Sequence, residues 1–90
     1  MNILKFFRLW YKPCKTLSKS LENTRIEHKS IDVDENKELT EKDNVMSVPT
    51  IVILDEDDNE VGRFIGSRTK EQLLKELKKY EIQSSKKDNL

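Results

Sequence analysis

Residues 48–54 read Val48-Pro49-Thr50-Ile51-Val52-Ile53-Leu54, and this stretch decides the fold. It is almost wholly apolar and rich in β-branched side chains, which favour strands. A strand without polar alternation is typically buried on both faces, because helices cover the sheet on either side. Residues 48–54 are therefore predicted to form an inner strand of a sheet that carries helices on both faces.

The segment after this strand predicts a hairpin. Residues 55–59 hold four acids and Asn59, a residue type that tolerates left-handed backbone angles, and they are expected to form a solvated turn. Residues 60–65 then return as a partner strand that ends at Gly66. The acids also resemble the start of a calcium loop. Such a loop needs Gly at its sixth position and Glu at its twelfth, where this chain has Glu60 and Gly66, so no metal site is predicted.

A helix is predicted to close the domain. Thr69 stands three residues before Gln72, the spacing of a capping box, and apolar residues follow at helical intervals up to Tyr80. The residues beyond Tyr80 are polar. The sequence therefore predicts one domain over residues 1–80 and a flexible polar tail over residues 81–90.

The N-terminal half predicts the remaining elements. Residues 3–9 are aromatic and β-prone, and residues 26–33 alternate in polarity, so each is expected to form a strand. Cys14, Leu17 and Leu21 recur at spacings of three and four, which indicates an amphipathic helix from Cys14 to about Arg25. A weaker helix, capped by Asp34 or Asn36, is expected to run to Lys42.

The resulting order, β-α-β-α-β-β-α, predicts an α/β fold with a four-stranded mixed sheet and helices on both faces.

The composition of the chain disfavours several classes of function. The chain has 90 residues and a formal net charge of zero, which disfavours nucleic acid as a partner. No apolar run is long enough for a membrane span, and no phosphate or dinucleotide motif predicts a cofactor. A single cysteine excludes an internal disulfide and fits a reducing, cytoplasmic location.

Two local strings, in this element order, resemble the thioredoxin superfamily. The first is Trp10-Tyr11-Lys12-Pro13-Cys14-Lys15, where the family pattern is Trp-Cys-Gly-Pro-Cys-Lys. The second is Val48-Pro49-Thr50, whose proline is cis in the family and faces the active site. Val33-Asp34 and Phe64-Ile65-Gly66 also fit. The chain resembles the minimal members, such as small phage thioredoxins and glutaredoxins, over about residues 3–80.

The chain departs from the family pattern at the residues that carry the family's redox chemistry. Tyr11 stands where the family has its attacking cysteine, and only the resolving cysteine remains, as Cys14. Lys5 stands where the family has a buried Asp, and Lys12 replaces the usual Gly. Dithiol exchange needs two thiols, so an ordinary dithiol reductase is disfavoured.

Two hypotheses follow. In the first, Cys14 is the catalytic residue of a monothiol thiol–disulfide oxidoreductase that exchanges with a protein or glutathione; the helix start and neighbouring cations favour its thiolate. In the second, the fold is a redox-inactive module that binds a protein partner. The resemblance implies a groove made by Trp10, Tyr11, Lys12, Pro13, Val48, Pro49 and Thr50 for either case. A buried, inert Cys14 is the alternative to the first, and a monomer is expected, or a Cys14-linked dimer under oxidation.

Overall fold

The computed structural model describes the backbone of residues 2–88 and the side chains of residues 2–80. The elements follow the predicted order, β-α-β-α-β-β-α. They are β1 (Asn2–Phe7), α1 (Lys12–Thr24), β2 (Lys29–Asp32), α2 (Lys37–Lys42), β3 (Thr50–Leu54), β4 (Glu60–Ile65) and α3 (Lys70–Asp88).

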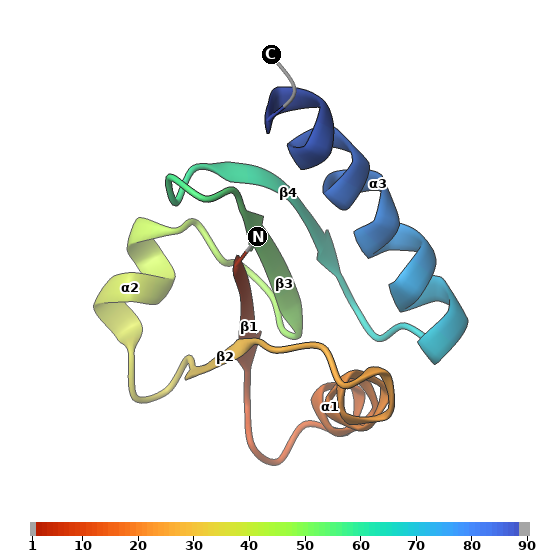
Figure 1. The fold of residues 1–90 in the computed structure, drawn as a ribbon. Coiled ribbons are helices and arrows are strands. Elements are labelled where there is room, and N and C mark those ends of the chain that lie inside the picture. Colours follow the sequence, from red (N-terminus) through yellow and green to blue (C-terminus); the bar gives the residue numbers. More distant parts are fainter. Residues whose placement is uncertain (1, 89–90) are drawn as a thin grey trace.

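The strands form one four-stranded mixed sheet in the order β2-β1-β3-β4, which confirms the predicted fold class. β1 pairs with β2 in parallel and with β3 antiparallel, and β3 pairs antiparallel with β4. In this register Lys5 lies opposite Ile51 of β3. Helices α1 and α3 cover one face of the sheet, and α2 covers the other (Figure 1).

Strand β3 divides the core between the two faces. Ile51 and Ile53 pack with Leu17 of α1 and with Leu73 and Leu77 of α3. Val52 points the other way and packs with a second cluster that includes Phe6, Ile31 and Val33. Burying a side chain of this size contributes roughly 1.5–3 kcal/mol. The predicted burial of this strand on both faces is therefore what holds the two helical layers on the sheet.

Several predicted boundaries were wrong by a few residues. β1 ends at Phe7 rather than Leu9, and both Leu9 and Trp10 are exposed. β2 covers only Lys29–Asp32 of the predicted 26–33. α1 begins at Lys12, two residues before Cys14, because Pro13 fits the first helical turn, where no backbone N–H is needed. β3 begins at Thr50, since Pro49 has no N–H to donate to a ladder.

The acidic turn at residues 55–59 differs from the solvated turn that was predicted. Asp55 is buried, and its Oδ1 accepts the backbone N–H groups of Asp57 and Asn59, both at 2.9 Å. The left-handed residue is Asp58, with φ 63°, not Asn59. One carboxylate of the turn thus satisfies the hairpin backbone, while residues 56–59 are exposed.

Helix α3 starts with the predicted capping box. The Thr69 N–H donates to Gln72 Oε1 at 3.0 Å, and the Gln72 N–H donates to Thr69 Oγ1 at 3.2 Å. Its backbone stays helical to Asp88, past the predicted domain end at Tyr80. The predicted flexible tail over residues 81–90 is not tested by this helix and stays a prediction.

Adjacent leucines of α3 provide a matched test of this core. Leu73 is fully buried, whereas Leu74 is 45% exposed. We expect Leu73→Ala to lower the free energy of unfolding by about 3 kcal/mol, through lost burial and the cavity left behind. Leu74→Ala should change it by less than about 1 kcal/mol. Urea titrations followed by circular dichroism measure both changes in the free energy of unfolding. Equal losses would contradict the structure, because they would show that Leu74 is as buried as Leu73.

Candidate functional site

The site begins at the turn that joins β1 to α1. Tyr11 has an extended backbone and precedes the helix, and its carbonyl accepts the N–H groups of Cys14 (3.0 Å) and Lys15 (3.3 Å). No side chain caps this helix start, and its first turn holds no acidic residue. The partial positive charge of the helix start is therefore not offset by a carboxylate in that turn.

Cys14 lies in this first turn and is 2% exposed. Its Sγ accepts a hydrogen bond from the backbone N–H of Arg8 at 3.4 Å. The thiol also lines a cavity of about 390 Å³ between the end of β1 and the side of α1. The other residues of this cavity, called here the thiol cavity, are Phe7, Arg8, Leu9, Lys15, Ser18, Lys19 and Glu22.

Lys5 is a buried cation on the face of β1 that packs against α1. Its side chain is only 6% exposed, its Nζ donates to Ser18 Oγ at 2.8 Å, and the ammonium lies 5.1 Å from the centre of the Phe7 ring. Burial lowers the pKa of Lys5 from its ordinary 10.5, because desolvation disfavours the ammonium. The negative charges of Cys14 and Glu22 act in the opposite direction and raise that pKa.

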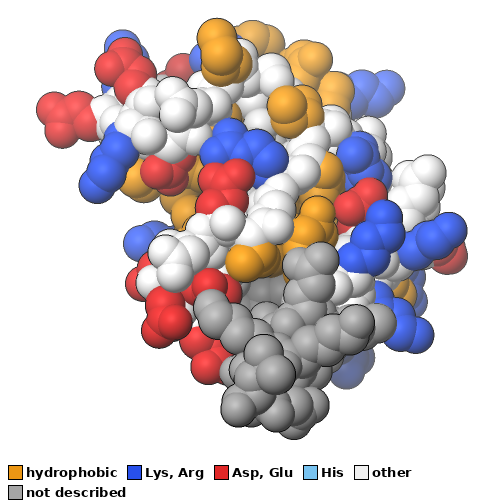
Figure 2. Space-filling view, turned by 90° about the horizontal axis from the view of Figure 1, so that it is seen from above, with side chains coloured by type: hydrophobic (Ala, Val, Ile, Leu, Met, Phe, Trp, Pro, Cys, Tyr) orange, Lys and Arg blue, Asp and Glu red, His pale blue; other side chains and the backbone are white. Residues whose placement is uncertain are grey.

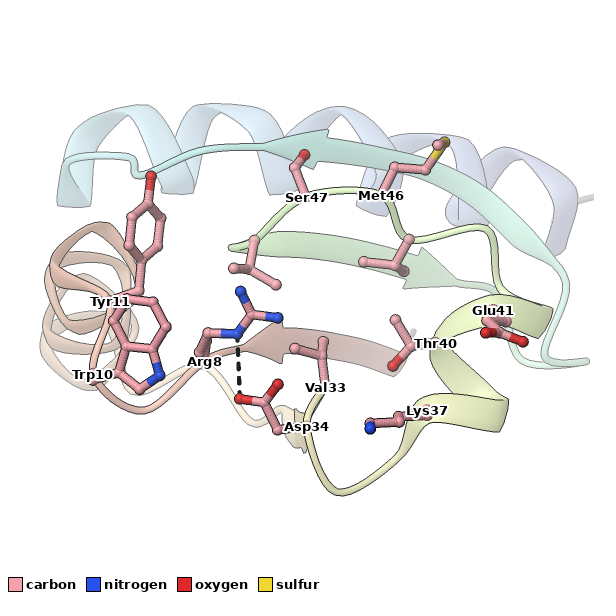
Figure 3. Close-up of a pocket in the computed structure, with 12 residues that line it drawn as sticks. Arg8, Trp10, Tyr11, Val33, Asp34, Lys37, Thr40, Glu41, Met46 and Ser47 are labelled. Carbon is pink, nitrogen blue, oxygen red and sulfur yellow. Dashed lines mark hydrogen bonds and ion pairs between the residues drawn. The ribbon is translucent and has the colours of Figure 1, made fainter.

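A second cavity, called here the groove, has a volume of about 420 Å³ and lies between the start of α1 and helix α2 (Figure 3). Arg8 and Asp34 cross its floor in an ion pair at 3.2 Å. Trp10 and Tyr11 stand at one end, edge to face, with ring centres 6.3 Å apart. The groove is lined by Arg8, Trp10, Tyr11, Val33, Asp34, Lys37, Thr40, Glu41, Val45, Met46, Ser47 and Val48.

The structure divides the predicted site residues between different places. Trp10, Tyr11 and Val48 line the groove, while Cys14 lines the thiol cavity. Pro49 and Thr50 are buried beside them, and Thr50 Oγ1 donates to the Ser47 carbonyl at 2.6 Å. The Val48–Pro49 peptide bond is cis. Lys12 is exposed and Pro13 half-buried in the first turn of α1, and neither lines either cavity.

Sequence reasoning missed the far wall of the groove. Lys37, Thr40 and Glu41 reach it from α2 (Figure 3). The loop after α2 supplies Met46, which is 94% exposed. Arg63 of β4 holds this loop, since its guanidinium donates to the carbonyls of Asp43 (2.9 Å) and Asn44 (3.3 Å). The only signal for this wall was Val33-Asp34, which leads from β2 toward α2.

Apolar side chains also reach the surface around the charged ones (Figure 2). Trp10 is 70% exposed and Leu9 66% exposed, both in the turn before α1. Among the described residues, no cluster of His, Cys, Asp or Glu could hold a metal ion. No helix within the same part of the chain is long and apolar enough to cross a membrane.

A sheet in the order β2-β1-β3-β4, a cysteine in the first turn after β1 and a cis-proline before β3 define a protein of the thioredoxin fold. The family model described as Thioredoxin matches residues 1–79, so the chain belongs to the thioredoxin family.

Individual proteins that are similar to this chain are also thioredoxins or thioredoxin-like proteins. The SPbeta prophage-derived thioredoxin-like protein YosR of Bacillus subtilis is 34% identical over 80 residues, covering 87% of this chain and 100% of YosR. A thioredoxin of Chlamydia pneumoniae is 36% identical over 83 residues, covering 87% of this chain and 80% of that one. The solved structure of chloroplastic thioredoxin z superposes with a TM-score of 0.75 at 31% identity, covering 89% of this chain and 77% of that one.

Lys5 should destabilise the protein. Replacing a buried charge with an apolar side chain of similar length is often stabilising, so we expect Lys5→Met to raise the free energy of unfolding by about 1 kcal/mol at pH 7. The pKa of Lys5 is lower in the folded state, so the unfolded chain binds this proton more tightly. Stability should therefore rise as the pH climbs from the folded-state pKa of Lys5 toward 10.5.

Urea titrations at several pH values measure this effect. Lys5→Met should flatten the rise, whereas Lys29→Met, which removes an exposed lysine of the neighbouring strand, should retain it. A Lys5→Met protein less stable than the parent at pH 7 would show that the Ser18 hydrogen bond outweighs the cost of burial.

Proposed function

We propose that this protein carries out monothiol thiol–disulfide exchange at Cys14, with glutathione or a protein thiol as the exchange partner. The observation that supports this is the setting of Cys14 Sγ, which lies in the first turn of α1 and accepts the Arg8 N–H. Both the helix start and a donated N–H favour an anionic sulfur. Cys14 is 2% exposed, but it lines the thiol cavity, and a small reactant would have to enter this cavity to reach the sulfur.

The exchange cycle can be completed with one cysteine if a second molecule supplies the thiol that releases Cys14 from the mixed disulfide. The Cys14 thiolate attacks one sulfur of a disulfide, forming a mixed disulfide as the old S–S bond breaks and its other sulfur leaves as a thiolate. An external thiolate then attacks the partner's sulfur and returns Cys14 as a thiolate. Tyr11 cannot replace that second thiol, because a phenol forms no disulfide. Such a cycle suits the cytoplasm, where thiols are kept reduced.

The proposal predicts a defined adduct. Folded protein incubated with oxidised glutathione should gain one glutathionyl group by mass spectrometry, and reduced glutathione should remove it. Cys14→Ser should gain none. A thiol that reacts when the chain is denatured in urea, but not in the folded protein, would contradict the proposal and make Cys14 a packing residue. A non-reducing gel of the same samples separates the Cys14-linked dimer from the glutathione adduct.

A second function is favoured by the exposed aromatic end of the groove. Trp10 is 70% exposed and lies beside Tyr11 and Val48, whereas Cys14 does not line the groove. Thioredoxin-family proteins typically interact with protein partners. The groove is therefore proposed to bind an extended peptide segment of a partner, through Trp10, Tyr11 and the backbone around Pro49, whether or not Cys14 reacts. Aromatic side chains dominate the binding energy of many such surfaces.

Trp10 is the only tryptophan, so its fluorescence reports directly on this groove. We expect extended peptides with apolar central residues to shift its emission, equally in the parent protein and in Cys14→Ser. Tyr11→Ala should weaken peptide binding about tenfold or more, as a buried aromatic contact does at an interface. Leu74→Ala removes an exposed apolar side chain on α3 and should leave binding unchanged. Binding that disappears in Cys14→Ser would instead tie recognition to the thiol.

A further inference from the structure

We propose that Lys5 is a positioning residue for Cys14: its buried ammonium stabilises the Cys14 thiolate. This inference rests on the proposed exchange at Cys14, and it assigns the thiol a partner within the chain. Lys5 does not touch the disulfide that reacts. Its role is to set the charge state of the sulfur.

The geometry that supports this is a polar stripe along α1. Cys14, Ser18 and Glu22 are spaced four residues apart, so they lie on one side of the helix, one turn above the other. All three line the thiol cavity. Lys5 reaches this stripe from β1, where its Nζ donates to Ser18 Oγ at 2.8 Å. The hydroxyl of Ser18 thus holds the ammonium at the middle position of the stripe, with the thiol residue one turn before it and the carboxylate residue one turn after it.

Among the charged groups that act on Lys5, the Cys14 sulfur is the anion with the larger effect. On the sheet, its register neighbours are Ser30 of β2 and Ile51 of β3, and neither is ionisable in this pH range. On α1, the groups that act on Lys5 are Cys14, which is 2% exposed, and Glu22, which is exposed. Arg8, Lys15 and Lys19 line the same cavity and add positive charge. Because solvent screens Glu22 more than Cys14, the buried pair interacts more strongly.

The pair also lowers the cost of charging the thiol. A buried ammonium and a buried thiolate are each costly alone, but together they compensate one another. The Lys5 ammonium is already fully protonated, so the proton that Cys14 releases passes to the solvent. The thiolate then attacks a disulfide sulfur, and the sulfur that leaves takes a proton from the solvent. The disulfide is the only co-reactant that this step requires.

The test compares rates of mixed-disulfide formation with oxidised glutathione. At pH 7, Lys5→Met should react about tenfold more slowly than the parent, because the nearby positive charge is lost. Lys29→Met removes an exposed strand lysine and should react within twofold of the parent. In strongly alkaline buffer, where the Lys5 ammonium loses its proton, the rates should converge. A rate that falls by the same factor at every pH would show that Lys5 acts only through packing, and an unchanged rate would also overturn the proposal.

A second measurement does not depend on exchange. The ε-methylene carbon of Lys5, followed by NMR, reports the titration of its amine in the parent and in Cys14→Ser. The pKa of Lys5 should be lower in Cys14→Ser, because the thiolate that raises it is gone. Identical titrations would overturn the pairing. If the pairing is present but the parent forms no glutathione adduct, the exchange function fails and the Lys5–Cys14 interaction stands. If the adduct forms equally fast in Lys5→Met, only the role of Lys5 fails.

Discussion

The antiparallel pairing of β3 with β1 is the constraint on which the rest of the structure depends. β3 supplies Ile51 and Ile53 to the cluster under α1 and α3, and Val52 to the cluster under α2. Its register with β1 sets which side of the sheet each β1 residue faces, because side chains alternate along a strand. Ile3 and Lys5 therefore point toward α1, and Phe6 points toward α2. A slip of one residue would move Lys5 to the opposite face, away from Ser18 and Cys14.

That placement creates a tension between stability and chemistry. The chain is short and has a small core, so a buried lysine is a considerable cost. Three features reduce it: the hydrogen bond to Ser18, the ring of Phe7 and the negative charges on α1. An apolar residue at this position would fill the space without that cost. On our proposal, a lysine that donates to Ser18 offsets this cost through what it does to the thiol one turn away on α1.

Sequence patterns predicted most of the fold but a smaller part of the candidate site. The apolar run at 48–54, the capping box at Thr69 and the spacing of Cys14 and Leu17 are local signals, and each predicted its element. Burial of polar groups is not a local property. Asp55 stands among three other acids and Lys5 among apolar residues, yet both are buried, because the hairpin backbone and Ser18 provide their partners. The α2 wall of the groove was missed for the same reason, since only the chain reversal after β2 brings Lys37 and Glu41 toward Trp10.

Two separate cavities lie beside the turn before α1. The groove presents the aromatic side chains of Trp10 and Tyr11, and the thiol cavity contains Cys14. Arg8 lies between them: its backbone N–H donates to Cys14 Sγ, while its side chain pairs with Asp34 in the groove. A partner that displaces Asp34 from the Arg8 guanidinium would act on the same residue whose backbone contacts the sulfur. Arg8 is therefore the residue at which the groove and the thiol cavity meet, and the two cavities share no other lining residue. In a chain with one cysteine, this arrangement keeps the aromatic groove and the thiol in separate cavities that border on one arginine.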